Sequence, residues 1–525
     1  MRLSHLLAVG VLSAVLAPVP SWAAGSVDCA ALASLVVPST TITGTTLVPS
    51  TATAPEYCRV LGHVDTEINF ELRLPTAWNG NFLFGGEGGL AGQISDQTGL
   101  QAGGWNGLRR GYAVVFSDTG HQGVPPPGAT SPVYDGSWAW QNPERQINWA
   151  HRSTHVVSIA AKAIIAEYYG QSARYSYFSG CSGGGRQATM TAQRYPTDFD
   201  GILSGAPFLS VTGQAMGWNW AMQALAENPI SPSKLPVLAS AVTEACDASD
   251  GLVDGLVSDP RRCKFDPREL ACDSADGPDC LTQRELDSVL KIYRGPSTSD
   301  GERLFPGFVP GEEDTQWPRA LVHTTNGGPG ELGALLPDQI LRYFVFGPDF
   351  DSMTFDFDTD PAALADAADL LDVKPDLSAF REAGGKMLMY HGWNDPRLTP
   401  WLSIQYRDAV IHEVGGGPER TDEFFRLFVA PGMGHCAGGP GPNTFDALTA
   451  LERWVEQGIA PTRLIATHPT STGTVDRSRP LCVYPQVAVY DGSGSIDDAS
   501  NFVCRDRGLV KGGIEHGGLR RGIGE

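Results

Sequence analysis

The sequence has 525 residues, of which 42% are hydrophobic and 18% charged, enough apolar material for a large core and for more than one compact unit. Its formal net charge of -21 disfavours binding to nucleic acid and to anionic membrane surfaces, since both repel an acidic protein. The same charge is an ordinary means of staying soluble and does not indicate a substrate.

The first residues have the pattern of an export signal. Met1-Arg2 is followed by an apolar run from Leu6 to Val19 and by a small-residue site at Ala23 and Ala24, which is typical of a secretory signal peptide. The alternative is a membrane anchor, but the run is shorter than the roughly 20 residues that a spanning helix needs. We therefore predict that residues 1–24 are a cleaved signal peptide. The mature protein would be secreted or periplasmic, without membrane association.

Residues 26–60 are rich in Ser, Thr and Pro, and we interpret them as a segment that wraps around the domain. From 60 to 210, short apolar runs alternate with helical patterns, which favours a mainly parallel sheet covered by helices on both faces. The predicted strands of this part are Phe70–Leu74, Asn81–Phe84, Tyr112–Ser117 and Ser176–Ser179, and the predicted helices are His151–Tyr169 and Gly183–Tyr195.

The pattern changes between residues 210 and 375, where Asp, Cys, Pro and Gly are frequent and loops dominate. The alternation of strands and helices then returns. The predicted elements are strands Lys386–Tyr390 and Phe424–Val429 and helices Trp401–Val414 and Phe445–Gln457. The sequence therefore predicts an α/β domain formed by residues 25–209 and 376–525, interrupted by an inserted domain at 210–375.

A candidate nucleophile lies in Gly180-Cys181-Ser182-Gly183-Gly184, which fits the pattern Gly-x-Ser-x-Gly. A predicted strand precedes this segment and a predicted helix follows it, and a sharp turn between such elements exposes the serine hydroxyl. The alternative is a Gly-rich turn that only joins the strand to the helix. We predict that Ser182 is the nucleophile of a hydrolase.

A serine hydroxyl needs a base that takes its proton and an acid that orients the base, and in this type of fold the acid and then the histidine follow the nucleophile. Asp395 and His435 each come just after a predicted strand, where a catalytic loop is expected. His391 lies too close to Asp395 in sequence to be its partner. The other downstream histidines lie in the insertion, in a helix or past the last helix. We predict a triad of Ser182, Asp395 and His435.

The oxyanion of such a reaction needs two N–H donors. The residue after the nucleophile, Gly183, is expected to supply one of them. The other is expected from the Gly-rich turn Gly85–Gly89, where we favour Gly89 over Gly88. Glu87 interrupts this turn, and the sequence leaves open whether its side chain faces substrate or solvent.

Two cysteines flank the predicted triad, because Cys181 precedes Ser182 and Cys436 follows His435. If the serine and the histidine lie within hydrogen-bond reach, their neighbours are also close. A Cys181–Cys436 disulfide would then join the two catalytic loops and fix their geometry. The alternative is that these two cysteines pair elsewhere in the chain.

Three long segments, GCSGGGRQATMTAQRYPTDFDGILSGAP, YHGWNDP and FFRLFVAPGMGHC, resemble the tannase and feruloyl esterase family. This family also includes the enzyme that hydrolyses mono(2-hydroxyethyl) terephthalate. The resemblance extends from about residue 28 to residue 505. It implies an α/β-hydrolase core with a large lid domain inserted between nucleophile and acid, the triad named above, and esters of aromatic acids as substrates.

The resemblance also implies a structural calcium ion in the lid, because the loop that begins at Cys246 matches the family's calcium loop. Calcium prefers six to eight oxygen ligands, and the alternative is a solvated acidic loop. The implied ligands are the carboxylates of Asp247, Asp250 and Asp254 and the backbone carbonyls of Leu252 and Leu256.

The number of cysteines is even, which fits an oxidising compartment, but their spacing does not determine how they pair. The pairing implied by the resemblance uses all ten. The five bonds would be Cys29–Cys58, Cys181–Cys436, Cys246–Cys263, Cys272–Cys280 and Cys482–Cys504.

Together these features predict a secreted serine carboxylic ester hydrolase that cleaves esters of aromatic acids through an acyl-enzyme. Feruloyl and other hydroxycinnamoyl esters are the first expectation, and galloyl esters or a terephthalate monoester are alternatives. A peptidase or amidase is a further alternative, and an intact triad argues against a non-catalytic polyphenol or carbohydrate binder. We expect a small-molecule aromatic ester as the substrate and a monomer or homodimer as the assembly.

Large aromatic residues occur in the insertion. They could stack on an aromatic acyl group, or they could pack in the core of the insertion. They are Trp218, Trp220, Trp317, Tyr343 and Phe344.

Overall fold

The computed structural model describes residues 27–96 and 106–508. The predicted signal peptide, residues 1–24, lies outside this described part of the chain. In the described ranges, no helix has both the length and the apolar character that crossing a bilayer requires.

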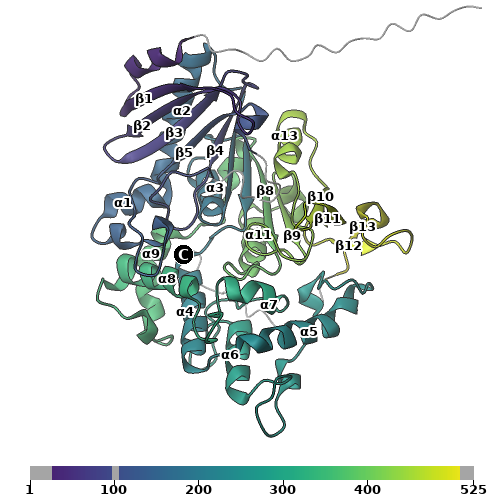
Figure 1. Cartoon of the computed structure of the whole chain (residues 1–525). Coiled ribbons are helices and arrows are strands. Elements are labelled where there is room, and N and C mark those ends of the chain that lie inside the picture. The colour runs from purple at the N-terminus through teal and green to yellow at the C-terminus, as the bar shows by residue number, and fades with distance from the viewer. Residues whose placement is uncertain (1–26, 97–105, 509–525) are drawn as a thin grey trace, which may run out of the picture.

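A nine-stranded sheet forms the centre of the molecule, with the strand order β1-β2-β3-β5-β4-β6-β7-β8-β9 (Figure 1). The run from β5 to β9 is parallel, and β1, β2 and β3 extend it as antiparallel strands. The strands of this sheet are β1 (Thr40–Val48), β2 (Tyr57–Val64), β3 (Ile68–Pro75), β4 (Asn81–Gly85), β5 (Ala113–Ser117), β6 (Tyr175–Cys181), β7 (Gly201–Gly205), β8 (Lys386–Gly392) and β9 (Phe425–Ala430).

Helices cover both faces of the sheet, and two short hairpins follow near the C-terminus. The helices outside the insertion are α1 (Pro143–Ile147), α2 (Ser153–Tyr169), α3 (Gly183–Arg194), α10 (Ser378–Glu382), α11 (Trp401–Val414), α12 (Gly417–Asp422) and α13 (Ala447–Gln457). The hairpins pair β10 (Arg463–Pro469) with β11 (Val475–Cys482) and β12 (Val487–Tyr490) with β13 (Phe502–Arg505).

The sequence of β8 explains why helices lie on both faces. Met387 and Met389 pack into one apolar cluster with residues of α2, α3 and α11. Leu388 and Tyr390 point to the opposite face and pack into a second cluster with residues of α13, β10 and β11. A strand covered on both faces needs this continuous apolar run rather than alternation with polar residues. The predicted α/β architecture is therefore confirmed.

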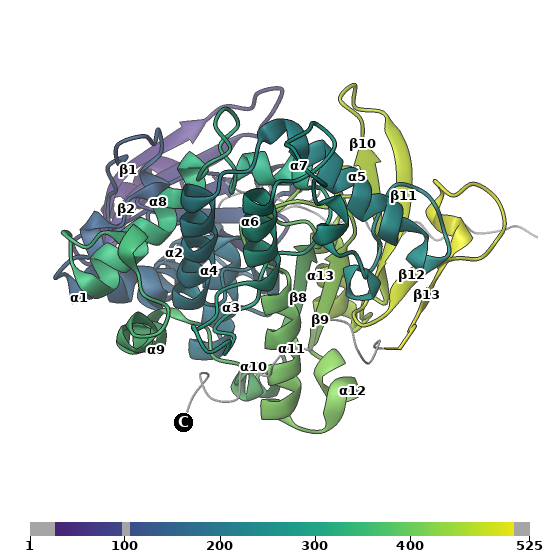
Figure 2. The same cartoon turned by 90° about the horizontal axis from the view of Figure 1, so that it is seen from below.

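The insertion between β7 and β8 forms a helical lid with its own core, built mainly from α4, α5 and α6. Figure 2 shows these helices together in front of the carboxyl ends of the central strands. The lid helices are α4 (Val211–Glu227), α5 (Leu235–Cys246), α6 (Gln283–Arg294), α7 (Glu313–Gln316), α8 (Glu331–Ile340) and α9 (Ala365–Leu371).

The two chain crossings between sheet domain and lid are bonded to each other. The buried carboxylate of Asp372 accepts hydrogen bonds from the hydroxyl groups of Ser210 and Thr212, at 2.7 and 2.8 Å. It also accepts from the backbone N–H of Val211 at 2.7 Å. One side chain therefore joins both crossings and caps the start of α4.

The strands and helices predicted between residues 60 and 210 and after 375 are present, with ends shifted by a few residues. The interpretation of residues 26–60 as a wrapped segment is wrong, because they contain β1 and the start of β2 at the sheet edge. Their Ser and Thr residues are compatible with a half-exposed edge strand. The strand β7 was not predicted, because GILSG is short and Gly-bounded.

Candidate active site

Ser182 lies in the sharp turn between β6 and α3. Its backbone has φ 63° and ψ -122°, a conformation that is strained for any residue with a side chain. The turn also requires small neighbours, because a Cβ atom on Gly180 would come within 2.4 Å of the backbone of Gly184. These constraints explain the glycines of the Gly-x-Ser-x-Gly pattern and leave the serine side chain free to point out of the turn.

Asp395 follows β8 and His435 follows β9, and their side chains are joined. The Nδ1 atom of His435 lies 2.7 Å from Oδ2 of Asp395, whose side chain is 0% exposed. The other oxygen, Oδ1, accepts from the backbone N–H groups of Arg397 and Leu398 at 2.8 and 3.0 Å. This pairing leaves Nε2 of His435 as the atom that can take a proton from a nucleophile.

The charge of Asp395 is stabilised in spite of its burial. Burial alone would raise the pKa of this carboxyl, but the charge of His435 and the hydrogen bonds from His391 and His435 outweigh it and lower the pKa below its ordinary value. Asp395 therefore stays ionised at neutral pH and can orient and stabilise an imidazolium at His435.

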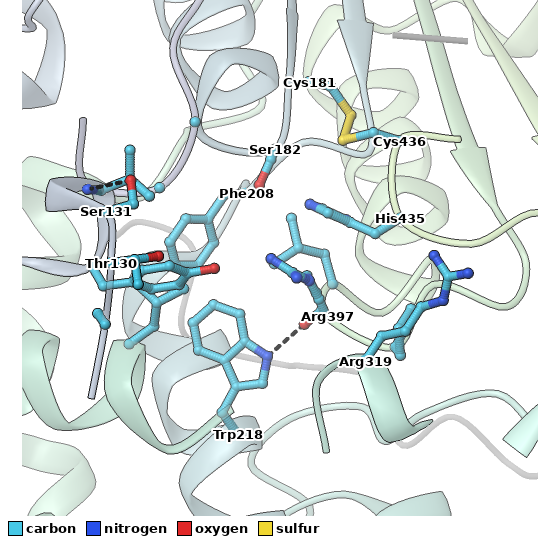
Figure 3. A pocket seen from close by; sticks show the side chains of 18 of the residues that line it. Thr130, Ser131, Cys181, Ser182, Phe208, Trp218, Arg319, Arg397, His435 and Cys436 are labelled. Atoms are coloured by element: carbon cyan, nitrogen blue, oxygen red, sulfur yellow. Dashed lines mark hydrogen bonds between the residues drawn. A yellow bond between two sulfur atoms is a disulfide. The ribbon is translucent and has the colours of Figure 1, made fainter. Parts of the chain in front are cut away.

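Ser182 and His435 line one cavity of about 620 Å³, together with Cys181 and Cys436. Figure 3 shows the Ser182 hydroxyl and the His435 ring turned toward each other, beside the Cys181–Cys436 disulfide. The structure thus brings the three residues predicted as a triad to the carboxyl ends of β6, β8 and β9. This is the edge at which parallel α/β sheets bind ligands.

All five predicted disulfides are present, and no cysteine is free among the described residues, which include all ten. The bond between Cys181 and Cys436 joins the nucleophile turn to the histidine loop across 255 positions of sequence. The other four are Cys29–Cys58, Cys246–Cys263, Cys272–Cys280 and Cys482–Cys504.

The two glycines predicted to stabilise the oxyanion lie next to each other. A Cβ atom on Gly183 would come within 2.9 Å of the Gly89 nitrogen. Gly183 begins α3, so its N–H has no partner within the helix. Gly89 has φ +56°, and a Cβ atom there would lie 2.5 Å from the carbonyl oxygen of Val133. Both Gly88 and Gly89 line the cavity.

Glu87 faces neither substrate nor solvent. Its side chain is buried and accepts hydrogen bonds from the backbone N–H and the hydroxyl of Ser95, at 2.9 and 2.8 Å. Burial raises the pKa of this carboxyl to about 8. The Glu87 N–H donates to Oε1 of Gln187 on α3 at 3.2 Å. Glu87 therefore connects the Gly-rich turn to its surroundings, which the sequence pattern alone could not show.

The cavity wall combines aromatic, hydroxyl and cationic groups. Its aromatic part includes Phe208, which follows β7, and Trp218 of the lid helix α4 (Figure 3). Arg319 and Arg397 also line it, on the side of His435 in the same view. The Trp218 indole donates to the backbone carbonyl of Arg397 at 2.5 Å, so a lid helix and the loop of Asp395 are directly joined. Three hydroxyl-bearing residues also contribute, namely Thr130, Ser131 and Tyr134.

Of the lid aromatics singled out in the sequence, Trp218 lines this cavity. Trp317 is buried in the lid core, and Trp220 packs edge-on against Phe357. Phe344 packs against two tryptophans of the segment before α2. Phe208, Arg319 and Arg397 were not predicted. Phe208 follows β7, and because that strand was not predicted either, Phe208 could not be placed from the sequence.

The loop predicted to bind calcium lies in the lid after α5. Its donor types suit calcium, and Asp247 and Asp254 are largely buried. Arg479 of β11 is bonded to one oxygen of Asp254. Across residues 27–96 and 106–508, no three His, Cys, Asp or Glu side chains are grouped around a point that could hold a metal ion. The carboxylates instead accept from backbone N–H groups of Asp254 (3.1 Å), Gly255 (2.9 Å), Leu252 (2.8 Å) and Leu256 (3.2 Å).

Comparison with known proteins identifies the family of this fold and site. A sequence model described as tannase and feruloyl esterase matches residues 52–505. The chain belongs to the tannase and feruloyl esterase family. It is therefore a carboxylic ester hydrolase, and the resemblance noted in the sequence is confirmed.

Individual relatives agree with this assignment. The chain is 38% identical to an uncharacterised esterase of Xanthomonas campestris, over 92% of either chain. It is 33% identical to the mono(2-hydroxyethyl) terephthalate hydrolase of Piscinibacter sakaiensis, over 87% of this chain and 86% of that one. The crystal structure of feruloyl esterase B from Aspergillus oryzae superposes with a TM-score of 0.79 at 27% identity, over 90% of this chain and 98% of that one. The α/β-hydrolase fold with a lid is confirmed by this likeness.

Proposed function

We propose that this esterase cleaves esters of aromatic acids, feruloyl and other hydroxycinnamoyl esters first, with Ser182, Asp395 and His435 as its catalytic triad. The observation that supports this most is the pair of buried Asp395 and His435, which faces the strained Ser182 turn in a cavity walled by Trp218 and Phe208. Aromatic walls suit a planar acyl group, because ring stacking adds to the burial of apolar area.

The reaction follows from this geometry as acyl transfer in two halves. His435 takes the proton of Ser182 through Nε2 while the serine oxygen attacks the ester carbonyl. The N–H groups of Gly183 and Gly89 stabilise the oxyanion. His435 then gives its proton to the leaving alcohol, and the acyl group remains on the serine oxygen. Water attacks the acyl-enzyme with His435 again as the base, and the aromatic acid is released.

The experiment for the acyl group compares methyl ferulate, methyl gallate and the 2-hydroxyethyl monoester of terephthalate on the purified protein, with p-nitrophenyl acetate as a general ester. The proposal expects turnover of all four substrates to depend on Ser182 and, among the three aromatic esters, the highest kcat/KM on methyl ferulate. Turnover of p-nitrophenyl acetate without any of the aromatic esters would contradict the substrate class. No ester turnover at all by the folded protein would contradict the proposed triad.

A second substrate is favoured by the two arginines of the cavity wall. The terephthalate monoester carries a free carboxylate, and a guanidinium group binds carboxylates with paired hydrogen bonds. Arg319 and Arg397 both line the cavity. The alternative proposal is therefore an esterase for aromatic acids that carry a second acid group, with the monoester of terephthalate as the representative.

This alternative makes a specific prediction for Arg319→Gln. Loss of a charged hydrogen bond is expected to raise KM for the terephthalate monoester by about 10-fold or more, while the constants for uncharged methyl ferulate change little. Steady-state kinetics on the two substrates measure the difference. Equal effects on both substrates would show that Arg319 acts on the shape of the cavity rather than on the charge of the substrate.

We also propose that the loop of Asp247, Asp250 and Asp254 binds a structural calcium ion, with the carbonyls of Leu252 and Leu256 as further ligands. The three carboxylates lie within eight residues of one another, but they are not grouped around one point in this structure. Bound calcium would draw them together and replace N–H contacts of the loop with cation–oxygen contacts. Removal of calcium by a chelator is then expected to lower Tm by several degrees, and calcium but not magnesium should restore it. In Asp247→Asn the chelator should have no effect, whereas the exposed control Asp366→Asn should respond like the parent. A parent Tm that ignores the chelator, in protein without bound calcium by metal analysis, would contradict the proposal.

Export is part of the same proposal. The pattern of residues 1–24 supports a cleaved signal peptide, and five disulfides suit an oxidising compartment. The mature enzyme would be secreted or periplasmic, and N-terminal sequencing of the exported protein tests the cleavage site directly.

A further inference from the structure

His391 is a buried histidine that the reaction described above does not use. It lies in β8, four residues before Asp395, and its side chain is 0% exposed. A polar ring in such a position needs hydrogen-bond partners, since an unsatisfied buried group destabilises the fold. Its partners are therefore informative about its protonation and its role.

The contacts of His391 determine which nitrogen carries the proton. Nε2 faces the carbonyl oxygen of Leu398 at 2.9 Å and Oδ2 of Asp395 at 3.2 Å. Both of these atoms can only accept, so Nε2 carries a hydrogen and donates to them. Nδ1 lies 2.8 Å from the hydroxyl of Ser403 on α11. That hydroxyl can donate to a neutral ring, so all polar atoms of His391 are satisfied without a charge.

The Oδ2 atom of Asp395 therefore has two donors, Nδ1 of His435 at 2.7 Å and Nε2 of His391 at 3.2 Å. Oδ1 is occupied by backbone N–H groups. The titratable groups that face this carboxylate are His435, from the loop after β9, and His391, from β8. The helix α11 contributes only the uncharged Ser403. His391 is thus the one side-chain donor, among the described residues, that shares the oxygen used by His435.

We propose that His391 is a positioning residue that acts through Asp395. It holds Oδ2 in line with Nδ1 of His435, and its N–H takes up part of the negative charge on that oxygen. The inference rests on the proposed triad. Two consequences follow: the orientation of Asp395 depends on His391, and so does the strength with which Asp395 retains the proton on His435.

The test compares two amide substitutions of similar size. In His391→Gln the amide nitrogen occupies the region of Nε2 and can still donate to Asp395. In His391→Asn the amide reaches only the region of Nδ1, near Ser403, and the donor to Asp395 is lost. For His391→Asn we expect kcat on methyl ferulate to fall by about 10-fold or more, with KM little changed. The acid limb of the kcat/KM profile should move up by about one pH unit, because the unshared carboxylate holds the proton on His435 more strongly.

His391→Gln should restore most of kcat and return the acid limb to the parent position. A merely structural role would lower Tm in both variants and leave the pH profile unmoved, and that result would overturn the inference. If His391→Asn does not fold, His391→Leu replaces it, because leucine fills a similar volume but has no donor to Asp395 and should move the acid limb in the same direction. An unmoved acid limb in a folded His391→Leu protein would also overturn the inference. Ser182→Ala is measured alongside. An active Ser182→Ala protein would mean that the triad itself is wrong, whereas an inactive one limits the failure to the role of His391.

Discussion

Replacement of Ser182 by alanine is expected to lower kcat/KM on methyl ferulate by about 10⁶-fold, to the limit set by trace contamination. The hydroxyl oxygen is the only heavy atom that the substitution removes, and the proposed acyl-enzyme cannot form without it. The backbone of the turn, with φ 63°, is as accessible to alanine as to serine. The folded structure and Tm are therefore expected to remain those of the parent.

A matched control uses a serine far from the chemistry. Ser233 is exposed on the lid and contacts Ser231, and Ser233→Ala should keep kcat/KM within about two-fold, as surface substitutions usually do. Circular dichroism and Tm verify that the Ser182 variant is folded. Substantial esterase activity in a folded Ser182→Ala protein would mean that another nucleophile carries out the reaction.

Replacement of Asp395 by asparagine is expected to lower kcat by about 10⁴-fold with the fold retained. The amide oxygen can still accept from the N–H groups of Arg397 and Leu398, but the amide nitrogen then faces Nδ1 of His435. Two donors cannot share that contact, so the imidazole adopts the tautomer that leaves Nε2 protonated and unable to take the serine proton. Steady-state kinetics at saturating substrate measure this effect.

The control for Asp395→Asn is a second aspartate–histidine pair in the same chain. Asp476 lies 2.7 Å from Nδ1 of His468, and its side chain is 53% exposed. Asp476→Asn removes the same charge from the same kind of pair, and we expect less than a two-fold change in kcat. If both variants lost activity equally, the loss would come from net charge or stability. If neither did, Asp395 would not be the acid of the triad.

The parts of this site that are set by contiguous stretches of sequence could be predicted. The strand, sharp turn and helix around Ser182 are contiguous, and Asp395 and His435 each follow a strand whose apolar run is visible in the sequence. Chain order and strand ends were enough to bring these residues to one edge of a parallel sheet. The disulfide pairing came from the family resemblance, since cysteine spacing alone leaves it open.

The remaining features depend on contacts between distant segments and have no local signature. Arg319 reaches the cavity because the lid folds back over the sheet, more than a hundred residues after Ser182 in the chain. Glu87 is buried, and its carboxyl group is bonded to Ser95, which lies outside the Gly-rich turn. His391 was set aside on sequence distance from Asp395, which argues against a triad partner but is compatible with a second donor.

The most direct measurement is the mass of the protein after reaction with a p-nitrophenyl phosphonate ester, which forms a stable bond with an activated serine. The triad of Ser182, Asp395 and His435 predicts one phosphonate per chain, located by peptide mapping on Ser182, with loss of esterase activity in proportion to labelling. Labelling should be slow in Asp395→Asn and absent in Ser182→Ala. A phosphonate on another residue, or complete inhibition with Ser182 unmodified, would contradict the assignment.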